Sequence, residues 1–293
     1  DTLCRYFGDH LPQFDMSGDT IAELSKKVAR SVIAYYSGWL QQRSPDGRVH
    51  VEAAITDLDM NGFMSAIHGL DRSRGLDIVL HTPGGDIEAT RAIVEYLFKM
   101  FSRDIRVIVP QIALSAGTMI ACASKVVIMA KHSCLGPTDP QVNGYPAMVV
   151  LQEIDQAIEE IKKEPLKQLV WQQVFSKYPP AFIANCERAR DVTRGFVKDW
   201  LEGGMLNHCQ DPSKAAEVVV DRLMDMGKTS SHGYHFMIDD CKSIGLNIKD
   251  LEADHELQEA VLSVHHAFEV SFSKTPAIKI IQNSNGGIWS VNG

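Results

Sequence analysis

The chain has 293 residues, of which 45% are hydrophobic and 23% charged, enough for one large globular domain with an extension or for two small domains. Its formal charge of −8, from 37 acidic and 29 basic residues, argues against binding to nucleic acid or to an anionic membrane. No apolar run reaches the roughly 20 residues that span a bilayer, and the first residues lack a signal-peptide pattern, so we expect a cytoplasmic protein.

The cysteines are scattered and form no Cys-x-x-Cys pair, which is typical of reduced thiols and not of a zinc site or a disulfide framework. We expect no metal site, and we also expect no cofactor.

The first part of the chain is predicted to be a helical segment over residues 1–45, followed by an α/β core over 46–144. Apolar residues at three-to-four spacing favour a helix across 20–43. The next expected elements, in chain order, are a strand at 49–55, a helix at 57–70 and a short apolar strand at 76–82. The last of these is bounded by turn residues, as buried parallel strands are.

Three apolar strands then alternate with helices. The strands are expected at 76–82, 105–110 and 125–130, and the helices at 86–101 and directly after Ser115. Such a β-α-β-α-β order predicts right-handed crossovers and a mostly parallel sheet with helices around it. The fold class is therefore α/β.

Residues 145–226 show helical periodicity, interrupted by proline and glycine where helices would start and stop. They are predicted to be a helical insertion. Residues 227–282 return to the core, where "DDCKSIGLNIKDL" indicates a short helix ending at Gly245 and leading into a strand. Residues 283–293 are predicted to be a flexible tail.

The stretch "ALSAGTM" places Ser115 in a small-residue turn between a strand and a helix. A serine hydroxyl becomes a good nucleophile only when a base removes its proton, and its attack creates an oxyanion that needs fixed donors. A helix N-terminus offers unpaired N–H groups for that purpose. Ser115 is therefore a candidate nucleophile, although such turns also serve simple helix–sheet packing.

A second turn, "HTPGGD", follows the strand at 76–82. Gly84 and Gly85 can present backbone N–H groups that no side chain covers. Parallel strands bring both turns to the same carboxyl edge of the sheet, where α/β proteins commonly build their sites. We expect the amides of Gly84, Gly85 and Ala116 to form an oxyanion hole.

The motifs "HTPGG", "SAGTMIA" and "LGPTDPQV", in this order, resemble the serine dehydrogenase proteinase family, distant relatives of the Clp proteolytic subunit and signal peptide peptidase A. A second matching block is "GKTSSHGYHFMIDDCKSIGL". The resemblance implies a Clp/crotonase-like ββα spiral, serine peptidase activity and assembly into homo-oligomers.

The resemblance also implies a triad in the chain order serine, aspartate, histidine. In this sequence these are Ser115 as nucleophile, Asp139 as the group that orients the imidazole, and His232 as general base and then acid. A triad is defined by geometry and not by chain order, so the order is permissible. The sequence departs from the family motif around the histidine, with Ser231 before it and Gly233 after it.

Several alternatives stay open. Asp139 lies between prolines in a loop, where an aspartate commonly makes an Asx-turn. His235 competes with His232 for the role of base, and His81 is a third candidate, or a strand-end residue that shapes the oxyanion site. A serine–lysine dyad is a further alternative, for which the lysines considered are Lys125, Lys131, Lys162 and Lys163.

The leading hypothesis is a serine peptidase that cleaves peptide bonds through an acyl-enzyme. Alternatives are a crotonase-like acyl-CoA enzyme, for which no adenine-binding signal is seen, and an oligomeric scaffold with a degenerate triad. The partners expected are a protein or peptide substrate and further copies of the chain. The sequence has no Walker motif, so any ATP dependence would require a separate ATPase or regulatory partner.

Overall fold

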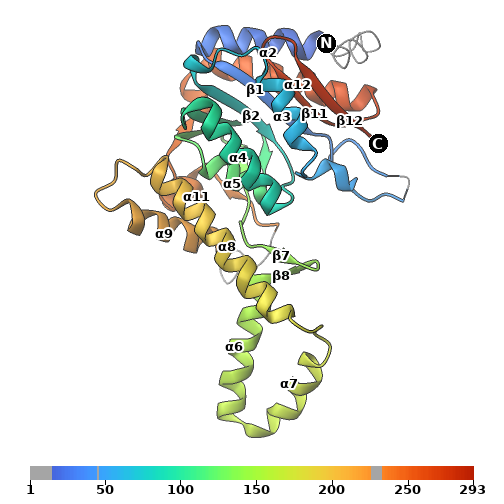
Figure 1. The fold of residues 1–293 in the computed structure, drawn as a ribbon, viewed down its shortest axis with the longest axis vertical. Helices are drawn as coiled ribbons and strands as arrows, with labels where there is room; N and C mark the ends of the chain where they lie inside the picture. The colour runs from blue at the N-terminus through green and yellow to red at the C-terminus, as the bar shows by residue number, and fades with distance from the viewer. Residues whose placement is uncertain (1–14, 45, 226–232) are drawn as a thin grey trace.

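The computed structural model describes residues 15–44, 46–225 and 233–293 (Figure 1). Its largest sheet consists, in spatial order, of β10 (Ile248–Asp250), β5 (Val126–Met129), β3 (Ile105–Val109), β2 (Leu76–His81), β1 (Ser31–Ser37), β11 (Ala277–Asn283) and β12 (Ile288–Asn292). The first five are parallel, and β11 and β12 add antiparallel pairs at one edge. The predicted α/β class with a mostly parallel sheet is confirmed.

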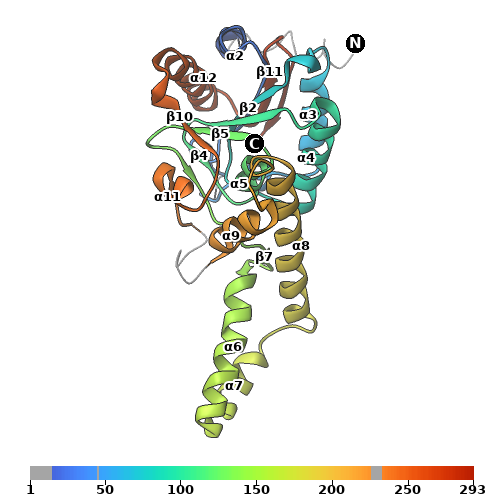
Figure 2. The same ribbon diagram turned by 90° about the vertical axis from the view of Figure 1, so that its left-hand side faces the viewer.

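Helices cover both faces of this sheet. One face packs against α3 (Asp59–Ile67), α4 (Ile87–Phe101) and α5 (Ala116–Cys122), and the other against α2 (Asp15–Val28) and α12 (His255–Lys274) (Figure 2). A small second sheet, formed by β4 (Ile112–Ala113), β6 (Cys134–Leu135) and β9 (Phe236–Met237), lies beyond the carboxyl ends of the parallel strands. The short helix α11 (Ile238–Ser243) precedes β10, as the sequence predicts.

The N-terminal segment corrects two predictions. The helix expected across 20–43 ends at Val28, and Ser31–Ser37 form β1 near the middle of the sheet. Every residue of β1 is buried between the two helical layers, so its β-branched and aromatic side chains favour a strand. The strand expected at 49–55 is instead a 3₁₀ helix, Val51–Ala53, followed by a single bridge from Ile55 to Gly85.

The C-terminal segment corrects a third prediction. Residues 288–292 form β12, paired with β11, where we expected part of a flexible tail. The pairing supplies partners for the backbone groups of this segment, and Trp289 packs against the main hydrophobic core.

The helices expected between 145 and 226 are α6 (Ala147–Lys163), α7 (Gln168–Phe175), α8 (Phe182–Gly203) and α9 (Pro212–Met224). They follow a small hairpin of β7 (Gln141–Val142) and β8 (Tyr145–Pro146). Figures 1 and 2 show α6 and α7 projecting away from the core, while α8 runs back to it. Within the described ranges, no helix combines the length and hydropathy needed to cross a membrane.

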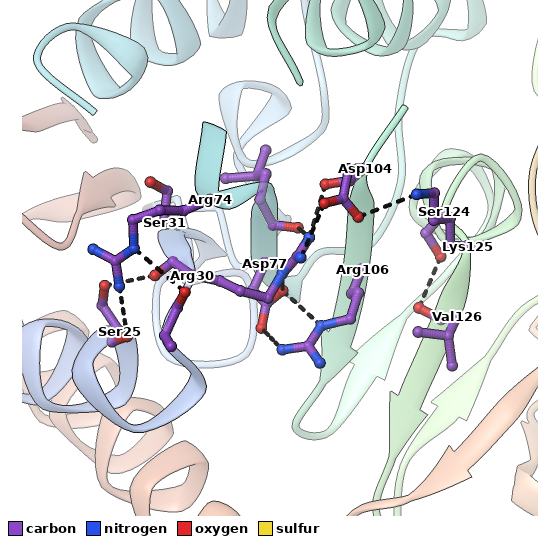
Figure 3. A network of polar contacts seen from close by, with 12 residues as sticks. Ser25, Arg30, Ser31, Arg74, Asp77, Asp104, Arg106, Ser124, Lys125 and Val126 are labelled. Carbon is purple, nitrogen blue, oxygen red and sulfur yellow. Dashed lines mark hydrogen bonds and ion pairs between the residues drawn. The ribbon is translucent and has the colours of Figure 1, made fainter. Parts of the chain in front are cut away.

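A buried ionic network closes the amino-terminal end of the parallel strands (Figure 3). Asp77 on β2 is fully buried and accepts hydrogen bonds from Arg30 Nε at 2.6 Å and Arg106 Nε at 2.8 Å. Arg30 also donates to the backbone oxygens of Leu76 and Asp104, at 3.2 and 2.8 Å. The network therefore connects β2, β3 and the segment before β1.

Candidate active site

Ser115 occupies a strained turn at the start of α5. Its backbone has φ 51° and ψ −116°, a region that L-residues other than glycine seldom adopt. Strained backbone of this kind is characteristic of nucleophile elbows, in which a sharp strand-to-helix turn exposes the serine hydroxyl. The side chain of Ser115 is half-buried and lines a cavity.

The two turns meet, as the sequence predicts. Thr82 N–H donates to the Ile112 oxygen, and Leu114 N–H donates to the Thr82 oxygen, both at 3.1 Å. A Cβ added at Gly84 would lie 2.7 Å from the Cβ of Ser115, and one added at Gly117 would lie 2.5 Å from Thr82 Cγ2. The close approach of the two turns therefore requires glycine at both positions.

The three amides expected in the oxyanion hole differ in whether they already donate a hydrogen bond. Gly84 N–H already donates to the hydroxyl of Thr82, at 3.2 Å. Within the part of the chain that the structure describes, Gly85 N–H and Ala116 N–H have no hydrogen-bond acceptor. Both amides therefore remain able to donate a hydrogen bond, and of the two residues Gly85 lines the cavity beside Ser115.

A cavity of about 360 Å³ connects the two turns with the loop after β6. Gly85, Ser115 and Asp139 all line it, so the structure brings these three predicted site residues together. Its remaining wall comes from the start of α4, from Met119 on α5, from Thr138 to Gln141 and from one side of α8. The contribution of α8 was not foreseen, because the sequence gives no sign of where an inserted helix docks.

The loop that carries Asp139 is attached to the serine turn by Thr118. This hydroxyl donates to the Ala113 oxygen and accepts from Gly136 N–H, both at 2.9 Å. Asp139 is 1% exposed, and its Oδ2 accepts from Gln141 Nε2 at 3.2 Å. Thr118 was not singled out in the sequence, where a threonine inside a predicted helix carries no distinguishing signal.

None of the candidate bases that the structure describes lines the cavity. His232 lies outside the described residues. His235 is exposed and does not line the cavity. The four lysines considered for a dyad do not line it either: Lys125 pairs with Asp104, Lys162 pairs with Glu159, and Lys131 and Lys163 are exposed.

His81 lies on the opposite face of the sheet from the cavity. Along β2, Leu80 faces the layer of α4 and α5, whereas Val79 and His81 face the layer of α2 and α12. The ring centroid of His81 is 4.4 Å from that of Trp39 and 5.5 Å from that of His265. Burial, reinforced by His265, lowers the pKa of His81 to about 3, and burial lowers the pKa of His265 to about 4.

Because of these two histidines, we expect the free energy of unfolding to fall at mildly acidic pH. A folded-state pKa below the ordinary value of about 6.5 means that the unfolded chain takes up the proton first. Stability is then complete above about pH 6.5 and falls toward pH 4, by up to about 1.4 kcal/mol per pH unit for each histidine. Urea unfolding between pH 4.5 and 7.5 measures the slope. His81→Phe should reduce it by about half, and an unchanged slope would contradict this explanation.

A family model described as ClpP-like SDH-type serine proteinase matches residues 48–282, which is most of the chain. Two uncharacterized proteins of Methanocaldococcus jannaschii are 28% identical over 194 residues and 35% identical over 112 residues. These matches cover 66% and 38% of this chain, and the chain spans 60% and 38% of the lengths of these relatives.

Two solved structures of the 1510-N membrane-bound stomatin-specific protease are also similar. One is a serine-to-alanine mutant, with 17% identity and a TM-score of 0.41, covering 71% of this chain and 79% of its own. The other, a lysine-to-alanine mutant in complex with a substrate peptide, has 19% identity and a TM-score of 0.40, covering 67% and 70%. By the match of the family model over residues 48–282, the chain belongs to the ClpP-like SDH-type serine proteinase family.

Proposed function

We propose that the protein is a serine peptidase that uses Ser115 as its nucleophile. The observation that carries the proposal is the strained turn of Ser115, which shares a cavity with Gly85 and is followed by Ala116. The amides of Gly85 and Ala116 lack an acceptor among the described residues. Such amides, fixed before the substrate arrives, stabilise an oxyanion without any reorganisation during the reaction. Family membership supports the same chemistry.

In this mechanism the Ser115 hydroxyl attacks the carbonyl carbon of a peptide bond and gives its proton to His232. The tetrahedral oxyanion accepts hydrogen bonds from Gly85 and Ala116. Its collapse breaks the C–N bond, and the leaving amine takes the proton from His232. Water, deprotonated by the same imidazole, then hydrolyses the ester and regenerates Ser115.

Asp139 is assigned the role of orienting the imidazole. It is buried at the cavity and held by a loop that Thr118 fastens to the serine turn. A carboxylate in that place stabilises both the correct tautomer and the imidazolium that forms during attack. Gly84 supports the hole indirectly, because its lack of a side chain allows the two turns to touch.

The substrate is inferred to be an extended or unfolded peptide segment. The cavity wall includes the apolar side chains of Ile87, Met119 and Val192, which suit an apolar side chain next to the bond that is cut. The catalytic steps need no nucleotide.

We also infer that copies of the chain associate, since Leu166, Leu169 and Val170 on the projecting helices are between 63% and 75% exposed.

Histidine variants test the assignment of the base. His232→Ala should lower kcat for a fluorogenic peptide by about 10³-fold or more, because serine then has no proton acceptor. His235→Ala is the matched control and should retain activity within about twofold, since that side chain is exposed outside the cavity. The opposite pattern would transfer the role to His235, and loss of activity in neither variant would contradict a histidine base.

A further inference from the structure

Residues 53–56, here called the strap, run beside the Gly-Gly turn, in which Gly84 approaches Ser115 and Gly85 approaches Ile55. Ile55 N–H donates to the Gly84 oxygen at 2.8 Å, and the Ile55 oxygen accepts from Asp86 N–H at 2.9 Å. A Cβ added at Gly85 would lie 2.2 Å from the Ile55 nitrogen, so the strap lies directly against this glycine. Ile55 therefore acts as a one-residue parallel strand beside the turn.

This bridge determines where the Gly85 amide points. In a parallel pair, one residue bonds to the two residues that flank its partner, and the partner's own N–H and C=O are directed away. Ile55 bonds to Gly84 and Asp86, so the N–H of Gly85 is directed away from the strap. Gly85 also lines the cavity of Ser115.

The strap is held in turn by buried side chains from three different elements. Ser37 Oγ on β1 donates to the Ala53 oxygen at 2.6 Å. Lys279 Nζ on β11 donates to the Ala54 oxygen at 2.5 Å. Thr56 N–H donates to Asp59 Oδ2, at the start of α3, at 3.1 Å. These bonds fix backbone groups of Ala53, Ala54 and Thr56, whereas the backbone groups of Ile55 bond to the Gly-Gly turn.

Lys279 and Asp59 form the centre of this arrangement. Their side chains are 1% and 0% exposed, and Lys279 Nζ lies 2.8 and 3.0 Å from the two carboxylate oxygens. Tyr35 donates a further hydrogen bond to Asp59 Oδ2 at 2.7 Å. A buried ion pair is commonly no more stabilising than an apolar pair of similar size, so stability alone does not require charged residues at this place.

We propose that the Lys279–Asp59 pair is a positioning device for catalysis, which fixes the strap and thereby aims the Gly85 amide at the substrate oxyanion. The inference rests on the proposed peptidase function. Neither side chain lines the cavity, so the effect passes through Ile55 and the Gly-Gly turn. In the sequence, Lys279 lies more than 100 residues from Ser115 and outside the motifs of the two turns.

The test replaces both charges together, so that neither is left buried alone. The double variant Lys279→Met, Asp59→Asn should lower kcat by about 10²-fold and change KM by less than about twofold, as expected when one oxyanion donor is misplaced. Ser37→Ala, a milder change, should lower kcat several-fold. Lys274→Met, which removes an exposed lysine at the end of α12, is the matched control and should change neither.

Amide hydrogen exchange separates this inference from the proposed function. In the double variant, the amides of Ile55 and Asp86 should lose protection, whereas amides of β3 should keep it. Wild-type protein that neither cleaves peptides nor reacts with a fluorophosphonate would refute the peptidase, and the exchange data would still decide whether the pair holds the strap. Unchanged protection at Ile55 and Asp86, or a kcat within twofold of wild type in folded variants, would overturn the inference.

Discussion

Ser115→Ala is expected to lower kcat for peptide hydrolysis by at least about 10⁴-fold, because the variant retains the cavity and the oxyanion donors but has no nucleophile. The melting temperature should stay near that of the wild type. Alanine meets the same backbone strain at φ 51° as serine does, and Ser115 makes no capping hydrogen bond at the start of α5. A fluorogenic peptide assay with a thermal melt measures both quantities.

The matched control for this experiment is Ser243→Ala, an exposed serine on α11. It should have wild-type kcat. If Ser115→Ala kept activity within about tenfold of wild type, in protein purified free of other peptidases, another group would have to be the nucleophile.

The second large effect concerns folding. Asp77→Asn is expected to lower the free energy of unfolding by about 3 kcal/mol, because it removes the buried carboxylate that pairs with both Arg30 and Arg106 in the network of Figure 3. The two arginine side chains are 15% and 26% exposed, so water relieves them only in part. Denaturant unfolding should show a lower midpoint with an unchanged slope.

Asp104→Asn is the appropriate comparison, since this carboxylate belongs to the same network but its side chain is 41% exposed. Its loss should cost less than about 1 kcal/mol. Equal effects of the two substitutions would contradict the view that burial of Asp77 determines the strength of the network.

The parts of the fold that the sequence predicts are those whose burial pattern is unambiguous. Residues 76–82, 105–110 and 125–130 are short apolar runs between turn residues, and all three form strands of the parallel sheet. Residues 31–37 are equally apolar but follow an amphipathic helix, and their spacing also fits helical periodicity. Only their complete burial between two helical layers, a tertiary property, distinguishes the two cases.

The same distinction applies to the candidate site. Turn chemistry was sufficient to predict that Gly84, Gly85 and Ser115 lie close together, because turns that follow neighbouring parallel strands meet at one edge of the sheet. The strap and its supports could not be predicted in this way. A lysine in the apolar strand "AIKIIQN" gives no sign that its ammonium group meets a carboxylate 220 residues earlier.

The most direct test of Ser115 as the nucleophile is the site of reaction with a fluorophosphonate, mapped by peptide mass spectrometry of the labelled wild-type protein. We expect one adduct per chain, on Ser115, and a rate of labelling that falls when His232 is replaced by alanine. An adduct on a different residue, or peptide cleavage that continues in fully labelled protein, would contradict it.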